Sequence, residues 1–218
     1  MSTNRYGLDL EKCLGAVTRT VTDIVKEGVQ SRNVQLERSY DTSANDLWDA
    51  VTNQERLKRW FMPVSGELKL GGQYQLEGNA HGTITKCKPQ QFFAATWEFG
   101  GEVSWIEVRV TPLEDEKARL TLSHICPLND HWEQYGPAAA GIGWDLAFIG
   151  LEVHLSDVFS DSFNEEAFAT SAEGNTYIVN VSVDWGRAAI KAGEEPEQAT
   201  AAAQRTAAFF TGEESQEG

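Results

Sequence analysis

The segment from Pro137 to Phe159 constrains the fold most, because it predicts a long helix that is apolar over most of its circumference. Large apolar side chains follow one another along it at helical spacing: Trp144, Phe148, Leu151, Leu155 and Val158. The polar residues form only a narrow strip: Asp145, Glu152, Ser156 and Asp157. A helix of this composition must be covered on more than one side, so the rest of the chain has to surround it.

An antiparallel meander is predicted ahead of this helix. Its segments are rich in β-branched and aromatic residues and are separated by glycine, proline or acidic turns. The expected strands are residues 66–70, 73–77, 81–88, 91–99, 103–111 and 118–125. Strand alternation gives three sets that we expect to face inward: Phe93, Ala95, Trp97 and Phe99; Ile106, Val108 and Val110; and Leu120, Leu122 and His124. Trp105 then lies on the other face of the sheet from its neighbour Ile106.

The N-terminal part predicts a short helix over 8–18 and a hairpin. Residues 19–26 form its first strand, and Glu27-Gly28 turn the chain into the second strand, VQLERSYD. The side chains of residues 41–43 accept backbone N–H bonds at helix starts, so a short helix should follow them. A second short helix runs from Asn53 to Phe61, before Pro63 ends it.

The C-terminal part predicts further helices, over 161–172, 176–192 and 195–211. We therefore divide the chain into three parts. Residues 1–33 form an N-terminal helix and hairpin strand packed on the domain. Residues 34–160 form the main domain, and residues 161–218 form a helical extension.

Charge and cysteine content exclude several function classes. The net charge is −15 and the pI is about 4.6, which disfavours both nucleic acid and an anionic membrane surface as partners. Cys13, Cys87 and Cys126 contain no CxxC pair, so we expect reduced thiols and a cytoplasmic location. The first residues lack the apolar region of a signal peptide, and no apolar run reaches membrane-spanning length.

Motifs for catalysis, metals and cofactors are missing from the sequence. His124, His131 and His154 do not have the spacing of metal ligands, and neither GxSxG nor a glycine-rich phosphate loop occurs. We therefore assign no metal, no cofactor and no catalytic residue. His124 interrupts an apolar strand face, and two interpretations stay open. It is a hydrogen-bonded core histidine, or a polar group that orients a ligand or acts as acid or base.

Several segments carry a family resemblance: LWDAVTNQERLKRWF (47–61), GELKLGGQYQLEGNAHGTI (66–84), FAATWEFGGEVSWIEVRVTP (93–112), RLTLSHI (119–125) and GIGWDLAFIGLEVHL (141–155). In this order they are similar to the activator-of-Hsp90-ATPase-like (AHSA1) branch of the helix-grip superfamily, which includes START, Bet v 1 and other SRPBCC proteins. The resemblance covers about residues 34–158, and the extension over 184–212 is similar to a tail on many bacterial members. It implies an α+β helix-grip fold, in which a curved antiparallel sheet grips the long helix and leaves a ligand cavity.

The first functional hypothesis is therefore binding of a hydrophobic or aromatic small molecule, without catalysis. We expect the cavity walls to be Trp144, Phe148 and Leu151 on the helix, Trp97, Phe99, Leu122 and His124 on the sheet, and Trp60 and Phe61 as a lid. The alternative for these rings is ordinary core packing.

Other hypotheses remain. The family name implies a co-chaperone-like interaction module with a chaperone partner, although the sequence lacks the additional N-terminal domain of the eukaryotic activators. Some relatives in the superfamily are cyclases or aromatases, and such an enzyme would use His124 as its acid or base. A structural or dimerising role, with a homodimer as the assembly, also stays open.

Overall fold

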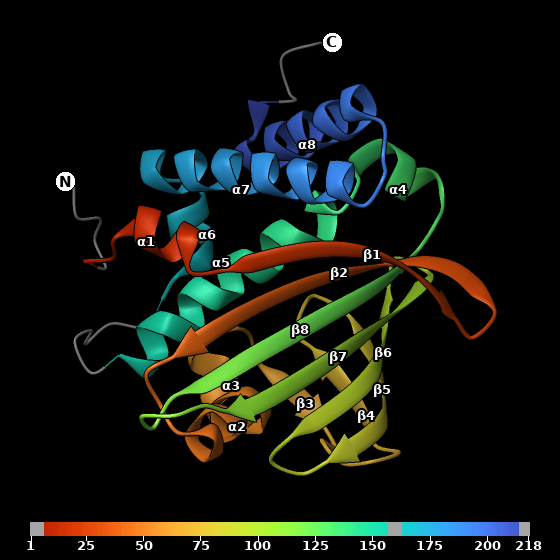
Figure 1. Ribbon diagram of the computed structural model, residues 1–218. Coiled ribbons are helices and arrows are strands. Elements are labelled where there is room, and N and C mark those ends of the chain that lie inside the picture. Colours follow the sequence, from red (N-terminus) through yellow and green to blue (C-terminus); the bar gives the residue numbers. More distant parts are fainter. Residues whose placement is uncertain (1–6, 157–162, 214–218) are drawn as a thin grey trace.

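Eight antiparallel strands form one curved sheet in the computed structural model, which describes residues 7–156 and 163–213 (Figure 1). The strands are β1 (Thr18–Lys26), β2 (Val29–Tyr40), β3 (Val64–Gly66), β4 (Gln73–Leu76), β5 (His81–Lys88), β6 (Phe92–Phe99), β7 (Glu102–Pro112) and β8 (Ala118–Pro127). Their spatial order is β1-β2-β8-β7-β6-β5-β4-β3. The predicted α+β class and the antiparallel sheet are confirmed.

Helices cover this sheet in two groups. Those described are α1 (Leu10–Gly15), α2 (Ala44–Thr52), α3 (Gln54–Trp60), α4 (Asp130–Tyr135), α5 (Ala138–Leu155), α6 (Glu165–Ala169), α7 (Ala172–Lys191) and α8 (Pro196–Thr211). The long helix α5 packs on β2 and α3, while α7 and α8 form the upper layer in Figure 1. The sheet and α3 therefore cover one side of α5, and α7 and α8 cover the other.

Burial of α5 accounts for its composition. Twelve of its residues are buried, and its apolar side chains point in all directions rather than to one face. By length and composition the helix would be able to cross a membrane, yet most of it is enclosed by the protein. The prediction that it is covered on more than one side is confirmed. Residues 157–159 of the expected helix lie outside the described residues.

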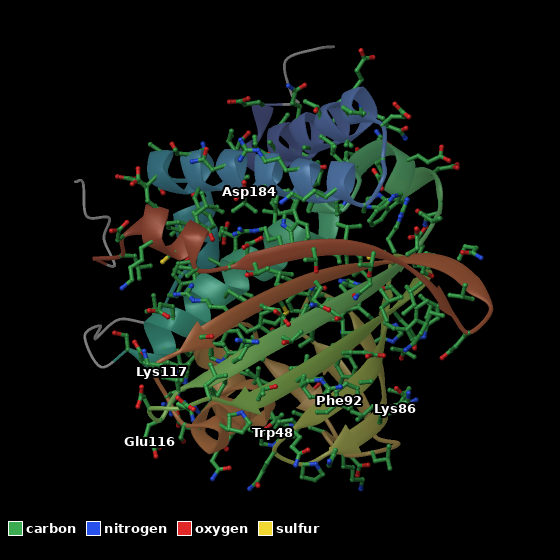
Figure 2. The ribbon with its side chains drawn as sticks, in the orientation of Figure 1. Trp48, Lys86, Phe92, Glu116, Lys117 and Asp184 are labelled. Atoms are coloured by element: carbon green, nitrogen blue, oxygen red, sulfur yellow. The ribbon has the colours of Figure 1, made fainter. Side chains whose placement is uncertain are left out.

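Asp145 is the exception within α5, because it is charged and fully buried. Arg19 of β1 forms two bonds with its carboxylate, Nη2 to Oδ1 at 2.6 Å and Nε to Oδ2 at 3.1 Å. The indole N–H of Trp185 in α7 donates to Oδ2 at 2.9 Å. Asp184, labelled on α7 in Figure 2, lies 3.5 Å from Arg19 Nη1. One carboxylate thus joins the first strand, the central helix and the C-terminal extension.

The predicted N-terminal hairpin is present as β1 and β2. Glu27 and Gly28 both have positive φ, at 51° and 84°, as a tight turn requires. The boundary that we drew between residues 33 and 34 falls inside β2, so the hairpin belongs to the sheet. Lys26 Nζ lies 2.8 Å from Glu107 Oε1 of β7, although β2 and β8 separate the two strands in the sheet. The end of the hairpin therefore bends over the outer face.

The meander matches the sequence prediction except at its start. The strand predicted over 66–70 is wrong, because β3 covers Val64–Gly66 and residues 67–72 form a loop. Gly66 explains the difference. Its φ is 99°, and a Cβ there would lie 2.2 Å from the carbonyl oxygen of Gln73, so the chain leaves the ladder at this glycine.

Side-chain alternation was predicted correctly for most of the inner face. Ala95, Ile106, Val108, Val110, Leu120, Leu122 and His124 are buried. Phe99 is a correction, since 59% of its surface is exposed where β6 ends at a glycine pair. Trp105 lies on the outer face opposite Ile106 and is nevertheless buried, beside its cross-strand partner Ile125.

The C-terminal helices differ from the prediction in detail. Residues 161–162 of the helix predicted over 161–172 lie outside the described residues. In the described part, α6 begins after its cap Asn164 and ends before Ser171, which caps α7 by accepting a bond from the Gly174 N–H. The α7 and α8 helices lie close to their predicted ranges. Helix α4 was not predicted at all, since its single turn and a half carries too few residues for a periodic pattern.

Two glycines of α5 provide a matched test of this packing. A Cβ on Gly141 would lie 2.2 Å from the fully buried ring of Trp185, whereas a Cβ on Gly143 meets nothing within 4 Å. We expect Gly141→Ala to lower the free energy of unfolding by about 1–3 kcal/mol through overpacking. Gly143→Ala should raise it by roughly 0.5–1 kcal/mol through helix propensity. Urea denaturation measures both, and a stabilising Gly141→Ala would contradict the contact.

Candidate functional site

A cavity of about 350 Å³ lies between the inner face of the sheet, α2, α3 and α5. We call it the inner cavity. The helices α2 and α3 contribute Trp48, Val51, Thr52, Leu57, Trp60 and Phe61, and α5 contributes Trp144, Ala147 and Phe148. The sheet and its loops contribute Val64, Leu68, Tyr74, Leu76, Ile84, Cys87, Pro89, Phe93, Ala95, Trp97, Ile106, Val108, Leu120 and Leu122.

The wall of the inner cavity is uncharged. None of its lining residues, all of which belong to the described part of the chain, is acidic or basic. Several of its polar donors are already engaged with the protein. Trp60 Nε1 donates to the Ala50 carbonyl at 3.0 Å, Tyr74 Oη donates to the Thr96 carbonyl at 2.7 Å, and Trp144 Nε1 donates to His124 Nδ1 at 3.0 Å. The cavity is therefore suited to an apolar guest.

Helix caps fix the position of the two short helices that close this cavity. Ser43 Oγ accepts from the Asp46 N–H at 3.3 Å, and Asn53 Oδ1 accepts from the Glu55 N–H at 2.9 Å, so both predicted helix starts are confirmed. Gly150 of α5 lets α3 approach closely, because a Cβ there would lie 2.4 Å from the Trp60 carbonyl oxygen. Trp48 of α2, which lines the cavity, is labelled in Figure 2.

A series of aromatic rings joins α3, α5 and β6 along the cavity wall. The Trp60 and Phe61 centroids are 5.6 Å apart, and Phe61 stacks on Trp144 at 5.7 Å with an interplanar angle of 22°. Trp97 meets Trp144 edge to face at 5.2 Å. Contacts of this kind add to the burial of the rings and hold them in one arrangement. The wall is thus preformed.

His124 lies behind this wall and is bonded on both ring nitrogens. Because Nδ1 accepts from the Trp144 indole, the proton resides on Nε2, which is 2.8 Å from Ser104 Oγ. Ser104 Oγ in turn donates to the Trp97 carbonyl at 3.2 Å. Burial lowers the pKa of His124 to about 4, so the ring is neutral at physiological pH. The geometry supports the core-histidine interpretation, because no ring nitrogen is free for acid–base chemistry.

The nine expected wall residues separate into three groups. Six line the inner cavity: Trp60, Phe61, Trp97, Leu122, Trp144 and Phe148. Phe99 and His124 instead line a second hollow, described below. Leu151 is fully buried and borders neither space.

Sequence reasoning missed much of the wall. Tyr74, Leu76 and Ile84 alternate along β4 and β5 on the inner face, so their strand pattern carried the signal. Trp48 was also identifiable, as part of the apolar face of α2. Leu68 was not, because it lies in the loop where a strand was predicted.

A second hollow, of about 650 Å³, lies on the other side of the Trp97, His124 and Trp144 rings. Trp97 borders both spaces. The hollow is bounded by the ends of β6, β7 and β8, by α4, by the start of α5 and by the end of α8. Within residues 7–156 and 163–213, no group of three or more His, Cys, Asp or Glu side chains is placed to hold a metal ion.

A curved antiparallel sheet that grips a long helix across a cavity defines the helix-grip class of α+β proteins. Residues 41–156, more than half of the chain, match the family described as Activator of Hsp90 ATPase homolog 1-like protein. The chain therefore belongs to this AHSA1 family, and the resemblance stated from the sequence is confirmed.

Solved structures support the same fold. The solution structure of CalU16 from Micromonospora echinospora aligns with a TM-score of 0.72 and 23% identity, over 82% of this chain and 97% of that chain. The crystal structure of CalU16 aligns with a TM-score of 0.64 and 24% identity, over 79% of this chain and 98% of that chain. The conserved protein of unknown function EF2215 from Enterococcus faecalis aligns with a TM-score of 0.53 and 16% identity, over 84% of this chain and 98% of that chain. At these identities the likeness shows the fold alone. No curated protein matches the chain.

The depressed pKa of His124 predicts acid sensitivity. A histidine in the unfolded chain has a pKa of about 6.5, so between about pH 6.5 and pH 4 the unfolded state binds a proton that the folded state does not. Stability therefore falls as the pH falls through this range, by roughly 3 kcal/mol from this group. His124→Asn keeps an acceptor for Trp144 and should flatten the profile of unfolding free energy against pH.

Two other groups also have shifted pKa values, and both are the same in wild type and His124→Asn. Burial, together with Arg56, lowers the pKa of His154, which acts in the same direction. Burial raises the pKa of Glu165 to about 6, which acts in the opposite direction. Nitrogen-15 NMR of the histidine ring checks the assignment directly. An imidazolium signal for His124 at pH 6 would contradict it.

Cys87 is predicted to be the reactive thiol of the native protein. It is exposed at the border of the inner cavity, whereas Cys13 is buried with a pKa raised by burial. Cys126 is partly exposed, and burial raises its pKa to about 12. Because the thiolate is the reactive form, Ellman's reagent should modify one thiol per native chain and three after denaturation. Cys87→Ser should leave none reactive in the native state, and rapid labelling of Cys126 would contradict the prediction.

Proposed function

We propose that this protein binds a neutral hydrophobic or aromatic small molecule in the inner cavity and does not catalyse a reaction on it. The observation that carries the proposal is a cavity of about 350 Å³ whose described wall holds no charged side chain and in which the donors of Trp60, Tyr74 and Trp144 are already bonded. Small-molecule sites are mostly apolar and range from roughly 300 to 1,000 Å³, so this space is at the lower end.

The uncharged wall narrows the chemistry of the guest. Burying an unpaired charge costs free energy, so a charged ligand would lose its hydration without a partner of opposite charge. A compact ring system with few polar atoms is favoured instead. The guest would stack among Phe61, Trp97 and Trp144, whose rings already define flat surfaces.

Access to the cavity is proposed between α2 and the β5–β6 turn. Trp48, Cys87, Pro89 and Phe93 line this part of the space, and Cys87 is exposed. Trp48 meets Phe93 edge to face at 6.2 Å, so these two rings would have to separate to admit a guest. The free cysteines in the described chain also support a reducing location, which we propose to be the cytoplasm.

A second candidate is a co-chaperone-like interaction module, and membership of the Hsp90-activator-like family is the observation that favours it. Its test is independent of any ligand. The purified protein is added to a bacterial Hsp90, and ATP hydrolysis is measured. Stimulation that saturates with protein concentration would support this function, and unchanged hydrolysis at high micromolar protein would reject it.

Two alanines of α5 give a matched test of the inner cavity. Ala147 lines the inner cavity and Ala140 lines the second hollow, two helical turns apart. We expect Ala147→Leu to fill the inner cavity and abolish binding of the neutral dye Prodan, and Ala140→Leu to leave that binding unchanged. Dye fluorescence measures the titration, and native mass spectrometry before and after organic extraction identifies any retained compound. Equal Prodan affinity in wild type and Ala147→Leu would reject the inner cavity as the site.

A further inference from the structure

The second hollow offers a site of different chemistry from the inner cavity. Its aromatic lining includes Phe99, Tyr135, Phe209 and Phe210, and two of these rings are well exposed, Phe99 at 59% and Phe209 at 63%. Tyr135 meets Phe209 at 6.4 Å, and Phe209 meets Phe210 edge to face at 5.8 Å. The hollow is therefore bordered by π faces that the protein itself does not cover.

The described wall of this hollow carries a negative charge but no permanent positive charge. Glu102, at the start of β7, is the single carboxylate among its described lining residues, and none of them is a lysine or arginine. Asn129 Nδ2 donates to Glu102 Oε1 at 3.0 Å, which holds the carboxylate at the border. Arg205 of α8 is directed elsewhere, because its Nε donates to the Gln134 carbonyl at 2.8 Å.

We infer that the second hollow binds a small organic cation, such as a tertiary or quaternary ammonium group on an aromatic or apolar body. Aromatic faces attract such cations through their quadrupoles, and the Glu102 carboxylate adds Coulombic attraction. The net charge of −15 further raises the local concentration of cations at the surface. An anionic ligand finds no lysine or arginine on this lining, whose basic residue types are His124 and His131, and a neutral ligand does not use the carboxylate.

The C-terminal extension builds part of this site. Thr206, Phe209 and Phe210 belong to α8, which lies outside the residues 41–156 that match the family. The Thr206 hydroxyl donates to the Tyr135 carbonyl at 2.9 Å, so α8 is docked directly on α4 beside the hollow. The extension therefore supplies a binding surface that the family domain alone does not contain.

The test uses the full chain and a pair of opposite charges on one body, benzyltrimethylammonium and phenylmethanesulfonate. Binding is followed by chemical-shift titration, so that the shifted residues report the location. We expect the cation to bind at least about tenfold more tightly than the anion and to shift signals of α4 and α8. Glu102→Gln should weaken the cation about threefold, as a partly exposed charge contact implies. Phe209→Leu, which keeps an apolar side chain, should also cost about threefold.

Matched controls separate this site from the inner cavity and from general charge effects. Glu116→Gln removes the same charge at the turn after the other end of β7 (Figure 2), and should leave cation affinity unchanged. Ala140→Leu should weaken the cation, and Ala147→Leu should not. Equal binding of anion and cation, an unchanged affinity in Glu102→Gln, or shifts confined to inner-cavity residues would each overturn the inference. None of these results depends on whether Prodan binds the inner cavity.

Discussion

Helix α5 has no polar face, and the arrangement of the whole protein depends on that constraint. A helix with a single apolar stripe is stable on the surface of a sheet, but α5 would leave large apolar side chains in water if only the sheet covered it. The sheet and α3 therefore cover one side, and α7 and α8 cover the other. The C-terminal extension is in this sense a part of the core rather than an appendage.

Hydrophobic contact alone would let α7 and the N-terminal strand slide along α5, and the Asp145 carboxylate removes that freedom. A buried carboxylate is costly unless its oxygens are bonded, and here Arg19 and Trp185 satisfy both of them in one geometry. The interaction specifies one relative position for three elements that are distant in sequence. Gly141 makes the same docking possible sterically, because the Trp185 ring occupies the space that a side chain would fill.

The aromatic layer of Trp97, His124 and Trp144 divides the interior into two spaces of different character. The Trp144 and His124 rings are hydrogen-bonded to each other and the Trp97 ring packs against both, so the layer is a fixed wall. On one side the space is lined by uncharged side chains, and on the other it is bordered by exposed rings and one carboxylate. One domain thus presents two distinct environments to small molecules. His124 serves as the link within this wall, which explains a polar residue on an otherwise apolar strand face.

The sequence by itself determined most of the secondary structure and the inward faces of most strands, because hydrophobic period, helix caps and turn residues act locally. It predicted the start of α2 and both ends of β5 and α3 to within one residue, and six of the nine residues expected to line the inner cavity do line it. Only the tertiary structure decided that Asp145 is paired with Arg19, that Phe99 and His124 face the second hollow, and that Leu151 faces neither space. The physical reason is that these outcomes depend on the curvature of the sheet and on which distant segment packs against each side of α5, and neither is encoded by the spacing of residues along one element.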